Sequence, residues 1–142
     1  VEVGIIGVKV AKQGNQWTAE DAWVTQDQYF QLSNAAIVGN ALFGLSSVGS
    51  GTYVIVDIKT GKVLFAGQPR AANNAAIEKA GNLLLVLEND GDLLFVDGTR
   101  RSGFTPVKQY KVSDKATWSA PAVSGNRLFV KDETSVALFT LD

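Results

Sequence analysis

A short segment occurs three times in the sequence, and this repetition constrains the fold more than any other feature. The copies are Ala35–Phe43, Ala75–Leu85 and Pro121–Phe129. Each contains a Gly-Asn pair next to apolar residues, and the three asparagines, Asn40, Asn82 and Asn126, are spaced by 42 and 44 residues. A period in the low forties, with short strands and Gly-rich turns, is typical of the four-stranded antiparallel blades of a β-propeller. The repetition therefore predicts an all-β chain.

Strands and turns recur in the same order within each repeat. We expect strands at about 36–38, 41–46, 52–57 and 62–66, then at 75–78, 82–88, 92–97 and 106–112, and finally at 118–123, 127–131 and 135–141. The second strand of a repeat is apolar at consecutive positions, as in Leu83–Leu87. Such a strand is expected to be covered on both faces, as blades are by their neighbours, whereas a sheet with one face in water would alternate.

Two further strands, at about 1–12 and 17–25, precede the repeats. In the first of them the apolar residues occupy odd positions up to Ile5 and even positions from Ile6 onward. A β-bulge next to Gly4 or Gly7 would absorb this one-residue slip. The alternative is a strand that is buried on both faces, where alternation is not needed.

The strand count predicts about three blades plus two extra N-terminal strands, arranged as an incomplete ring. We interpret 1–142 as a single propeller fragment, with 1–32 as the outer half of a blade, 33–67 and 72–112 as blades, and 118–142 as a blade that lacks its outer strand. Propellers usually close with about four to eight blades. Either the N-terminal strands complete the last blade of a small four-bladed ring, or something else supplies the missing blades. We favour the second arrangement, and expect an oligomer or part of a longer chain.

Apolar residues on the first and last strands predict an assembly edge. Its candidate residues are Val3, Ile5, Val8, Val10, Val136 and Leu138. Lys9 and Lys12, also on the first strand, are typical of residues that protect a strand edge against unwanted pairing.

A structural turn is predicted at Asp57, Thr60 and Gly61. The Asp57 carboxylate can accept hydrogen bonds from backbone N–H groups ahead of it, and Gly61 supplies the positive φ that a tight turn requires. Asp97 and Asp142 close the third strand of their repeats at the corresponding position. In the second repeat an insertion, Gly98–Gly103, replaces the compact turn, and insertions in repeats map to loops on one face.

The composition excludes several kinds of chemistry. The chain contains no Cys and no His, so disulfides, thiolate nucleophiles, the usual general base and the commonest metal ligands are absent. Its net charge of −1 offers no field for nucleic acid or an anionic membrane. Apolar runs are far shorter than the ~20 residues of a spanning helix. We expect no catalytic, cofactor-binding or metal-binding residues, no nucleic-acid partner and no membrane insertion.

Three groups of side chains allow both a functional and a structural interpretation. Glu88–Asp92 could suggest a calcium loop but lacks the twelve-residue pattern of one, so a solvated hairpin turn is favoured. Arg100–Arg101 could bind an anionic partner, although adjacent arginines in a polar insertion are usually exposed. Trp17, Trp23 and Trp118 could stack on a planar ligand; we favour packing between neighbouring sheets.

The repeats resemble the PQQ-like propeller repeat, in which an Ala-Val pair, a Gly-Asn or Gly-Asp pair, an apolar strand and a hairpin precede Asp-x-x-Thr-Gly-Lys-x-x-Trp. Val56–Phe65 is similar to that ending, with Phe65 in place of the docking Trp, and Trp118–Val130 is similar to the last blade of such proteins. The resemblance covers about residues 5–142. It implies the C-terminal part of a larger bacterial propeller that is exported, either periplasmic or extracellular.

This resemblance leaves three functions open. The first is a non-catalytic binding or scaffold module whose partners are proteins, namely other copies or the remaining blades. The second is a self-assembling extracellular structural subunit. The third is a fragment of a PQQ-dependent quinoprotein dehydrogenase; such enzymes use a vicinal disulfide, a catalytic Asp and Ca²⁺, and the absence of Cys counts against it. We therefore expect no cofactor and favour the first.

Overall fold

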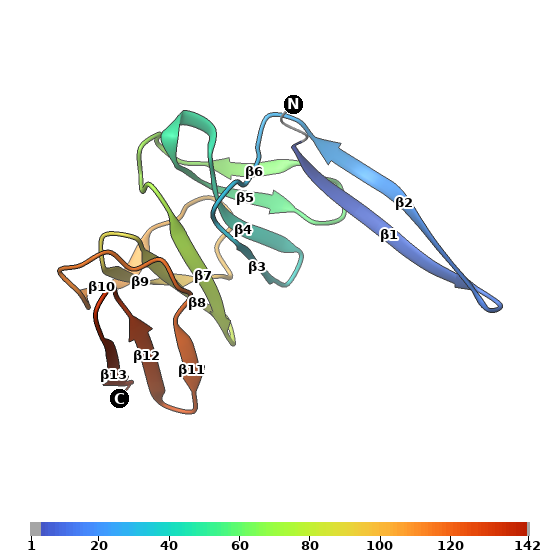
Figure 1. Cartoon of the computed structure of the whole chain (residues 1–142). Coiled ribbons are helices and arrows are strands. Elements are labelled where there is room, and N and C mark those ends of the chain that lie inside the picture. Colours follow the sequence, from blue (N-terminus) through green and yellow to red (C-terminus); the bar gives the residue numbers. More distant parts are fainter. Residues whose placement is uncertain (1–3, 142) are drawn as a thin grey trace.

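The computed structural model describes residues 4–141, which form thirteen strands and one short 3₁₀ helix. The strands form four antiparallel sheets that follow one another in chain order (Figure 1). The helix, η1 (Val48–Ser50), lies in the connection between the second and third strands of the first complete blade. Within residues 4–141 no helix has the length and apolar character needed to cross a membrane.

Each sheet is a meander in which a strand pairs with the next one along the chain. The N-terminal hairpin comprises β1 (Ile5–Gln13) and β2 (Gln16–Thr25). The first blade comprises β3 (Ala35–Val38), β4 (Ala41–Ser46), β5 (Thr52–Asp57) and β6 (Val63–Ala66). The middle blade comprises β7 (Ala75–Ala80), β8 (Leu83–Glu88), β9 (Asp92–Asp97) and β10 (Pro106–Lys111). The last blade comprises β11 (Ala122–Ser124), β12 (Arg127–Lys131) and β13 (Val136–Thr140).

The prediction of three aligned meanders is confirmed; most strands differ from the predicted bounds by about one residue or two, and β11 begins four residues later than expected. Residues 118–121 were predicted to begin a strand, but β11 begins only at Ala122. Pro121 explains this difference because it has no backbone N–H to donate to a sheet. The segment before it belongs to the connection from the middle blade, where the Thr117 N–H donates to the Asn89 carbonyl at 3.0 Å.

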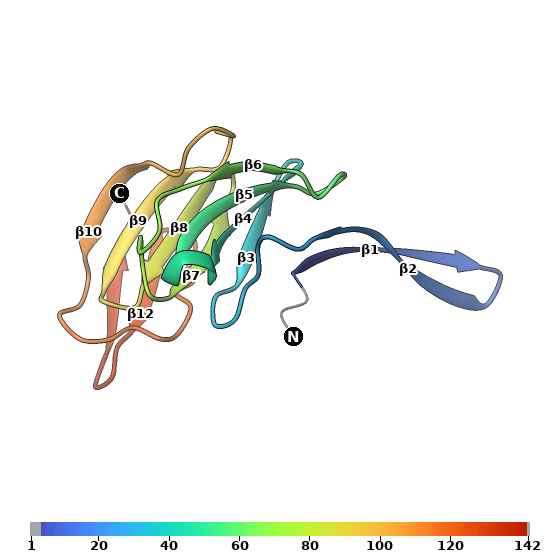
Figure 2. The same ribbon diagram turned by 90° about the horizontal axis from the view of Figure 1, so that it is seen from above.

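The middle blade is buried on both faces, as the consecutive apolar residues of β8 predict (Figure 2). Leu84 and Val86 belong to a core shared with β4 and β5 of the first blade. Leu85 and Leu87 point the other way and belong to a second core shared with β12. Because successive side chains of a strand lie on opposite faces, one strand contributes to two cores.

The hairpin of β1 and β2 projects away from the stacked blades (Figure 1). Its register shifts between Gly7 and Val8, so a β-bulge lies next to Gly7 as expected. The extra residue is Ala22 of β2, however, and Ile6, Val8 and Val10 stay exposed, so the bulge does not absorb the slip in the first strand. Most of its residues are exposed, so the alternative of a strand buried on both faces is wrong. The hairpin and β13 lie at opposite ends of the molecule and do not pair. The N-terminal strands therefore do not close a small four-bladed ring in this structure.

Candidate functional site

The turn at Asp57 is built from local hydrogen bonds. The carboxylate oxygen Oδ1 accepts from the Lys59 N–H at 3.0 Å, and from the N–H and hydroxyl of Thr60, both at 2.9 Å. Gly61 has a φ of 72° and donates its N–H to the Asp57 carbonyl at 2.8 Å. The side-chain hydrogen bond from Thr60, followed by the backbone donors, holds the pKa of Asp57 below its usual range. The turn is therefore a rigid platform at the end of β5.

Trp23 of β2 packs on this platform. Its indole Nε1 donates to the Ile58 carbonyl at 2.8 Å, and the Thr25 hydroxyl donates to the Gly61 carbonyl. The ring lies against Gly7 and Gly61, where any Cβ would overlap the indole. Packing between sheets is thus confirmed for Trp23, and these contacts join the hairpin to the first blade.

The other two tryptophans do not pack between sheets, so that expectation is wrong for them. Trp17 is exposed near the tip of the hairpin, with Lys12 Nζ 5.6 Å from its ring centroid. Trp118 is 60% exposed and lies in the connection that precedes β11. Neither position has an opposing sheet that could cover the ring.

The residues of the predicted assembly edge are not brought together. Val8 and Val10 are exposed on β1, and Ile5 is half-buried there. Val136 and Leu138 are exposed on β13, at the other end of the molecule. Val3 lies outside the described residues. The structure therefore contains two separate strand edges in place of one.

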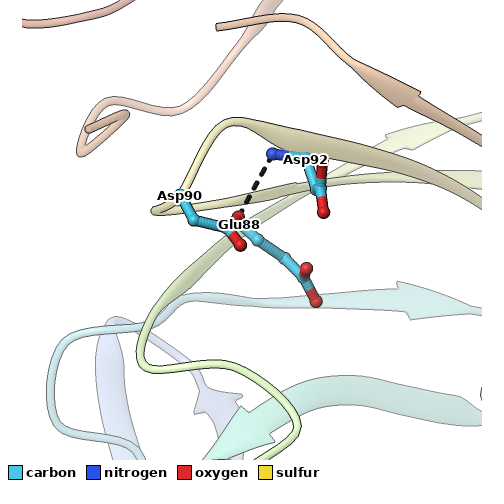
Figure 3. Close-up of side chains that lie close together, drawn as sticks. All are labelled: Glu88, Asp90 and Asp92. Atoms are coloured by element: carbon cyan, nitrogen blue, oxygen red, sulfur yellow. Dashed lines mark hydrogen bonds between the residues drawn. The ribbon is translucent and has the colours of Figure 1, made fainter. Parts of the chain in front are cut away.

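Three carboxylates converge at the turn between β8 and β9 (Figure 3). Oxygens of Glu88, Asp90 and Asp92 lie within 4.8 Å of one another. The Tyr53 hydroxyl donates to Glu88 Oε1 at 2.6 Å, and Lys111 Nζ lies 3.4 Å from Asp92 Oδ1. Each of these two donors lies against one of the three carboxylates. The expected hairpin turn is present, but Glu88 is half-buried and not fully solvated.

The environment of Glu88 disfavours its charged form. Burial raises the pKa of Glu88 above its usual range; the hydrogen bond from Tyr53 opposes this effect, and the carboxylates of Asp90 and Asp92 add to it. Tyr53 belongs to β5 and Glu88 to β8, so the hydrogen bond crosses from the first blade to the middle one.

The insertion after β9 also joins these two blades, which sequence reasoning missed. The Arg101 guanidinium donates to the carbonyls of Gly98 at 2.6 Å and Val38 at 3.1 Å, and lies 5.5 Å from the Phe43 ring centroid. Phe104 stacks on Tyr53 with centroids 4.0 Å apart. Arg101 is thus not the exposed residue that was expected; its neighbour in the sequence is exposed. Phe104, which directly follows the polar insertion, is the sequence signal that could have indicated that the insertion packs against the first blade.

A neutral surface lies where the connections between blades meet. Two adjacent hollows, of about 270 and 190 Å³, share Leu32 as a lining residue. We name the whole the Leu32 surface. The first hollow is lined by Gln31, Leu32, Ser33, Leu45, Ser46, Ser47, Ser50, Gly51 and Asn73. The second is lined by Leu32, Asn34, Asn74, Ala75, Ala76, Thr117, Trp118 and Ala120.

Hydrogen bonds between blades fix the floor of this surface. The Asn34 side chain accepts from the Ile77 N–H at 2.7 Å and donates to the Ile77 carbonyl at 2.8 Å. The side-chain amide thus makes the two hydrogen bonds that the backbone of a neighbouring strand would otherwise make. The Ser33 hydroxyl donates to Asn74 Oδ1 at 2.7 Å and accepts from the Ala75 N–H at 3.3 Å. The residues next to Leu32 are therefore held in place before any partner binds.

The chemistry of the Leu32 surface is that of a contact surface. None of its lining residues is charged, so the surface holds no group that transfers a proton near neutral pH. Leu32 is 76% exposed and Trp118 is 60% exposed, and both are surrounded by amide and hydroxyl groups. An exposed apolar group with a polar rim is typical of protein–protein contacts.

Comparison with known proteins supports the fold alone. No family model matches the sequence, and a search of curated proteins finds no significant match. The structure is similar to BamB from Moraxella catarrhalis, with a TM-score of 0.67 and 19% identity over 99% of this chain and 47% of that one. It is also similar to the computationally designed protein Ika8, with a TM-score of 0.59 and 17% identity over 96% of this chain and 43% of that one. The chain thus spans less than half the length of either structure. The likeness and the successive antiparallel sheets show a β-propeller with an incomplete ring.

Proposed function

We propose that the chain is a non-catalytic, protein-binding module of a β-propeller of the PQQ-like type, which acts outside the cytoplasm. The Leu32 surface is the observation that supports this proposal. Its occupant is an uncharged segment of a protein that places an apolar side chain next to Leu32. Amide and hydroxyl groups around the two hollows then bind the backbone of that segment.

The rigid floor and the neutral lining favour this kind of partner over a small charged ligand. A charged ligand would lose water on binding without gaining a counter-charge, which is costly. An uncharged peptide segment buries apolar area against Leu32 and Trp118, and keeps its hydrogen bonds through the polar rim. Aromatic and aliphatic groups at the centre of such a contact carry most of the binding energy.

Selection from a random peptide library displayed on phage tests the proposal. Peptides selected on the immobilised chain are expected to be uncharged and apolar, and to shift the NMR amide signals of residues 31–34 and 117–118. Leu32→Asp should weaken their binding by at least about tenfold, because it places a charge at the centre of the contact.

Leu64→Asp is the matched control, since Leu64 is also an exposed leucine but lies on β6, outside the Leu32 surface. It should leave the affinity unchanged. Peptides that bind equally well to both variants, or that shift signals elsewhere, would contradict the proposal.

Self-assembly is a second candidate function, and the open edges at the two ends of the molecule favour it. Among residues 4–141, β13 pairs with β12 alone, although the corresponding strands β5 and β9 each have two neighbours. The predicted edge residues Val136 and Leu138 lie on this strand. Pairing of two copies at such an edge depends on the concentration of the chain and on how well the two edges fit each other.

A further inference from the structure

Asn74 lines the second hollow of the Leu32 surface and is only 8% exposed. Its backbone N–H donates to Asn89 Oδ1 at 3.1 Å, and its backbone carbonyl accepts from the Asn89 N–H at 3.0 Å. Its side-chain oxygen Oδ1 accepts from the Ser33 hydroxyl at 2.7 Å. The side-chain amino group Nδ2 is the one polar group of Asn74 that has no partner among residues 4–141.

The hydrogen bonds of Ser33 determine which end of the Asn74 side chain is the oxygen. The Ser33 hydroxyl accepts from the Ala75 N–H at 3.3 Å and therefore gives its own hydrogen to Asn74. The atom that it reaches is an acceptor, which is Oδ1 and not the amino group. Solvent reaches the two N–H donors of Nδ2, because the one side-chain atom of residues 4–141 that is both fully buried and unpaired is Gln28 Oε1.

The corresponding residue of the preceding repeat uses its side chain differently. Asn34 and Asn74 each precede an Ala-Ala-Ile segment. Asn34 binds the backbone N–H and carbonyl of Ile77 in the next blade with the two ends of its side chain. Asn74 binds Ser33 with its oxygen and leaves its donors open. The contact between blades therefore does not use the donors of Asn74.

The other groups of the second hollow favour a neutral acceptor beside an apolar side chain. The indole N–H of Trp118 has no acceptor among residues 4–141, unlike that of Trp23. Leu32, Ala76 and Ala120 supply apolar lining. No lining residue is charged, so a carboxylate would lose water without meeting a cation. A neutral carbonyl oxygen matches both the unpaired donors and the absence of charge in this lining.

We propose that Asn74 Nδ2 donates to a backbone carbonyl of the bound segment, next to the apolar side chain that contacts Leu32. This inference rests on the proposed binding function of the Leu32 surface and adds the conformation of the partner. Carbonyls inside an α-helix already accept from N–H groups of the same helix, so the segment is extended or irregular at this residue. The hydrogen bonds of Asn74 fix its side chain beforehand, so little freedom is lost on binding.

An NMR titration of the isotope-labelled chain with N-acetyl-leucine methylamide tests the proposal. This neutral probe carries a leucine side chain and amide carbonyls, and a ligand of its size is expected to bind with a Kd of about 1 mM. The side-chain NH₂ signals of Asn74 and the indole N–H signal of Trp118 should shift with the same saturation. N-acetyl-leucine, which has a free carboxylate in place of the methylamide, should bind at least about threefold more weakly.

Asn74→Asp replaces the donor with an acceptor and keeps an oxygen for the Ser33 hydroxyl. It should weaken binding of the methylamide by at least about tenfold. Asn82→Asp is the control, because Asn82 is exposed in the turn after β7 and lies outside the Leu32 surface. This control should leave the affinity unchanged. Should Asn74→Asp not fold, the shift of the Asn74 NH₂ signals in the wild type decides.

Binding that leaves the Asn74 NH₂ signals in place, or that is as tight to Asn74→Asp as to the wild type, would overturn the inference. The absence of a saturable shift, or tighter binding of N-acetyl-leucine than of the methylamide, would do so too.

The peptides selected by phage display separate this failure from a failure of the proposed function. Loss of their binding in Leu32→Asp but not in Asn74→Asp would refute the role of Asn74 alone. Binding that persists in both variants would refute the binding function of the Leu32 surface as well. The bound peptides should give the transferred NOEs of an extended chain, and helical NOEs would contradict the proposed conformation.

Discussion

Glu88 shows how the burial of a single carboxyl group makes stability depend on pH. Burial disfavours the Glu88 carboxylate, and its neighbours Asp90 and Asp92 add negative charge, so the pKa of Glu88 in the folded chain lies above its usual value. A folded state with a raised pKa binds the proton more tightly than the unfolded state does. Its contribution to stability is therefore present at low pH and is lost as the pH rises through the pKa of folded Glu88.

Glu88→Gln tests this effect, because Gln keeps an oxygen acceptor for the Tyr53 hydroxyl but cannot ionise. We expect a flatter dependence of Tm on pH between about pH 4 and pH 7, with a higher Tm than the wild type at the upper end. Tyr53→Phe is the opposite variant: it leaves the half-buried carboxylate without its donor and should lower stability at pH 7 by about 1–3 kcal/mol. Calorimetry across this pH range measures both, and identical pH profiles for wild type and Glu88→Gln would contradict the assignment.

At the scale of residues, sequence reasoning succeeded where the chemistry is local. The turn at Asp57 follows from an acceptor and a glycine that lie four positions apart, so a sequence pattern can represent it. The role of Arg101 could not be predicted, because its partner, the Val38 carbonyl, is 63 residues away in the sequence. Leu32 was missed for the same reason, since the residues that line the two hollows beside it come from segments far apart in the sequence.

At the scale of elements, the hairpin of β1 and β2 depends on very few contacts. An isolated two-stranded hairpin is at best marginally stable in water. Trp23 and Thr25 supply the side-chain hydrogen bonds that hold it against the turn of the first blade. The strands themselves were predicted well, because alternation and Gly-rich turns are local signals. The contact of the hairpin with the first blade could not be predicted, because it depends on where Gly7 and Gly61 lie relative to Trp23 in the folded chain.

Trp23→Ala is therefore expected to release the hairpin while the blades stay folded. Amide hydrogen exchange in β1 and β2 should accelerate by at least about tenfold, with little change in β7–β10. Trp17→Ala removes an equally large but exposed ring and should leave the exchange of the hairpin close to that of the wild type. Equal acceleration throughout the chain after Trp23→Ala would show that the hairpin is part of the main cooperative unit.

At the scale of the whole molecule, the two cores between blades differ in size. Among residues 4–141, twelve buried residues form the core between the first and middle blades, and five form the core between the middle and last blades. The last blade also has an open edge and an exposed outer face. In stacked repeats, stability is approximately a sum of the repeats and the interfaces between neighbours. Among the three blades, the last one should consequently be the first to unfold.

Leu87→Ala tests this ranking, because Leu87 lies in the smaller core. The substitution should cost about 2–5 kcal/mol and increase hydrogen exchange most strongly in β11–β13. Leu83→Ala is the control on the same strand, since Leu83 is 40% exposed and should cost much less. A response of the first blade as large as that of the last would contradict the ranking.

The repeat period predicted the stacking of blades, but the openness of the ring could be inferred only from the strand count. No local signal in the sequence distinguishes an edge that is covered from one that is not.

Burial of the middle blade on both faces has a consequence for how its strands find their alignment. In a sheet with one wet face, a shift by one residue exposes apolar side chains to water and is strongly disfavoured. In β8 the same shift would exchange Leu84 and Val86 for Leu85 and Leu87, so each face would stay apolar. Alignment must then be specified by the volumes of the side chains and by the turn before β9. Gly91 at that turn has a φ of 94° and leaves no space for a Cβ beside the Ser113 carbonyl. Glycine at that position therefore helps to fix the register between β8 and β9.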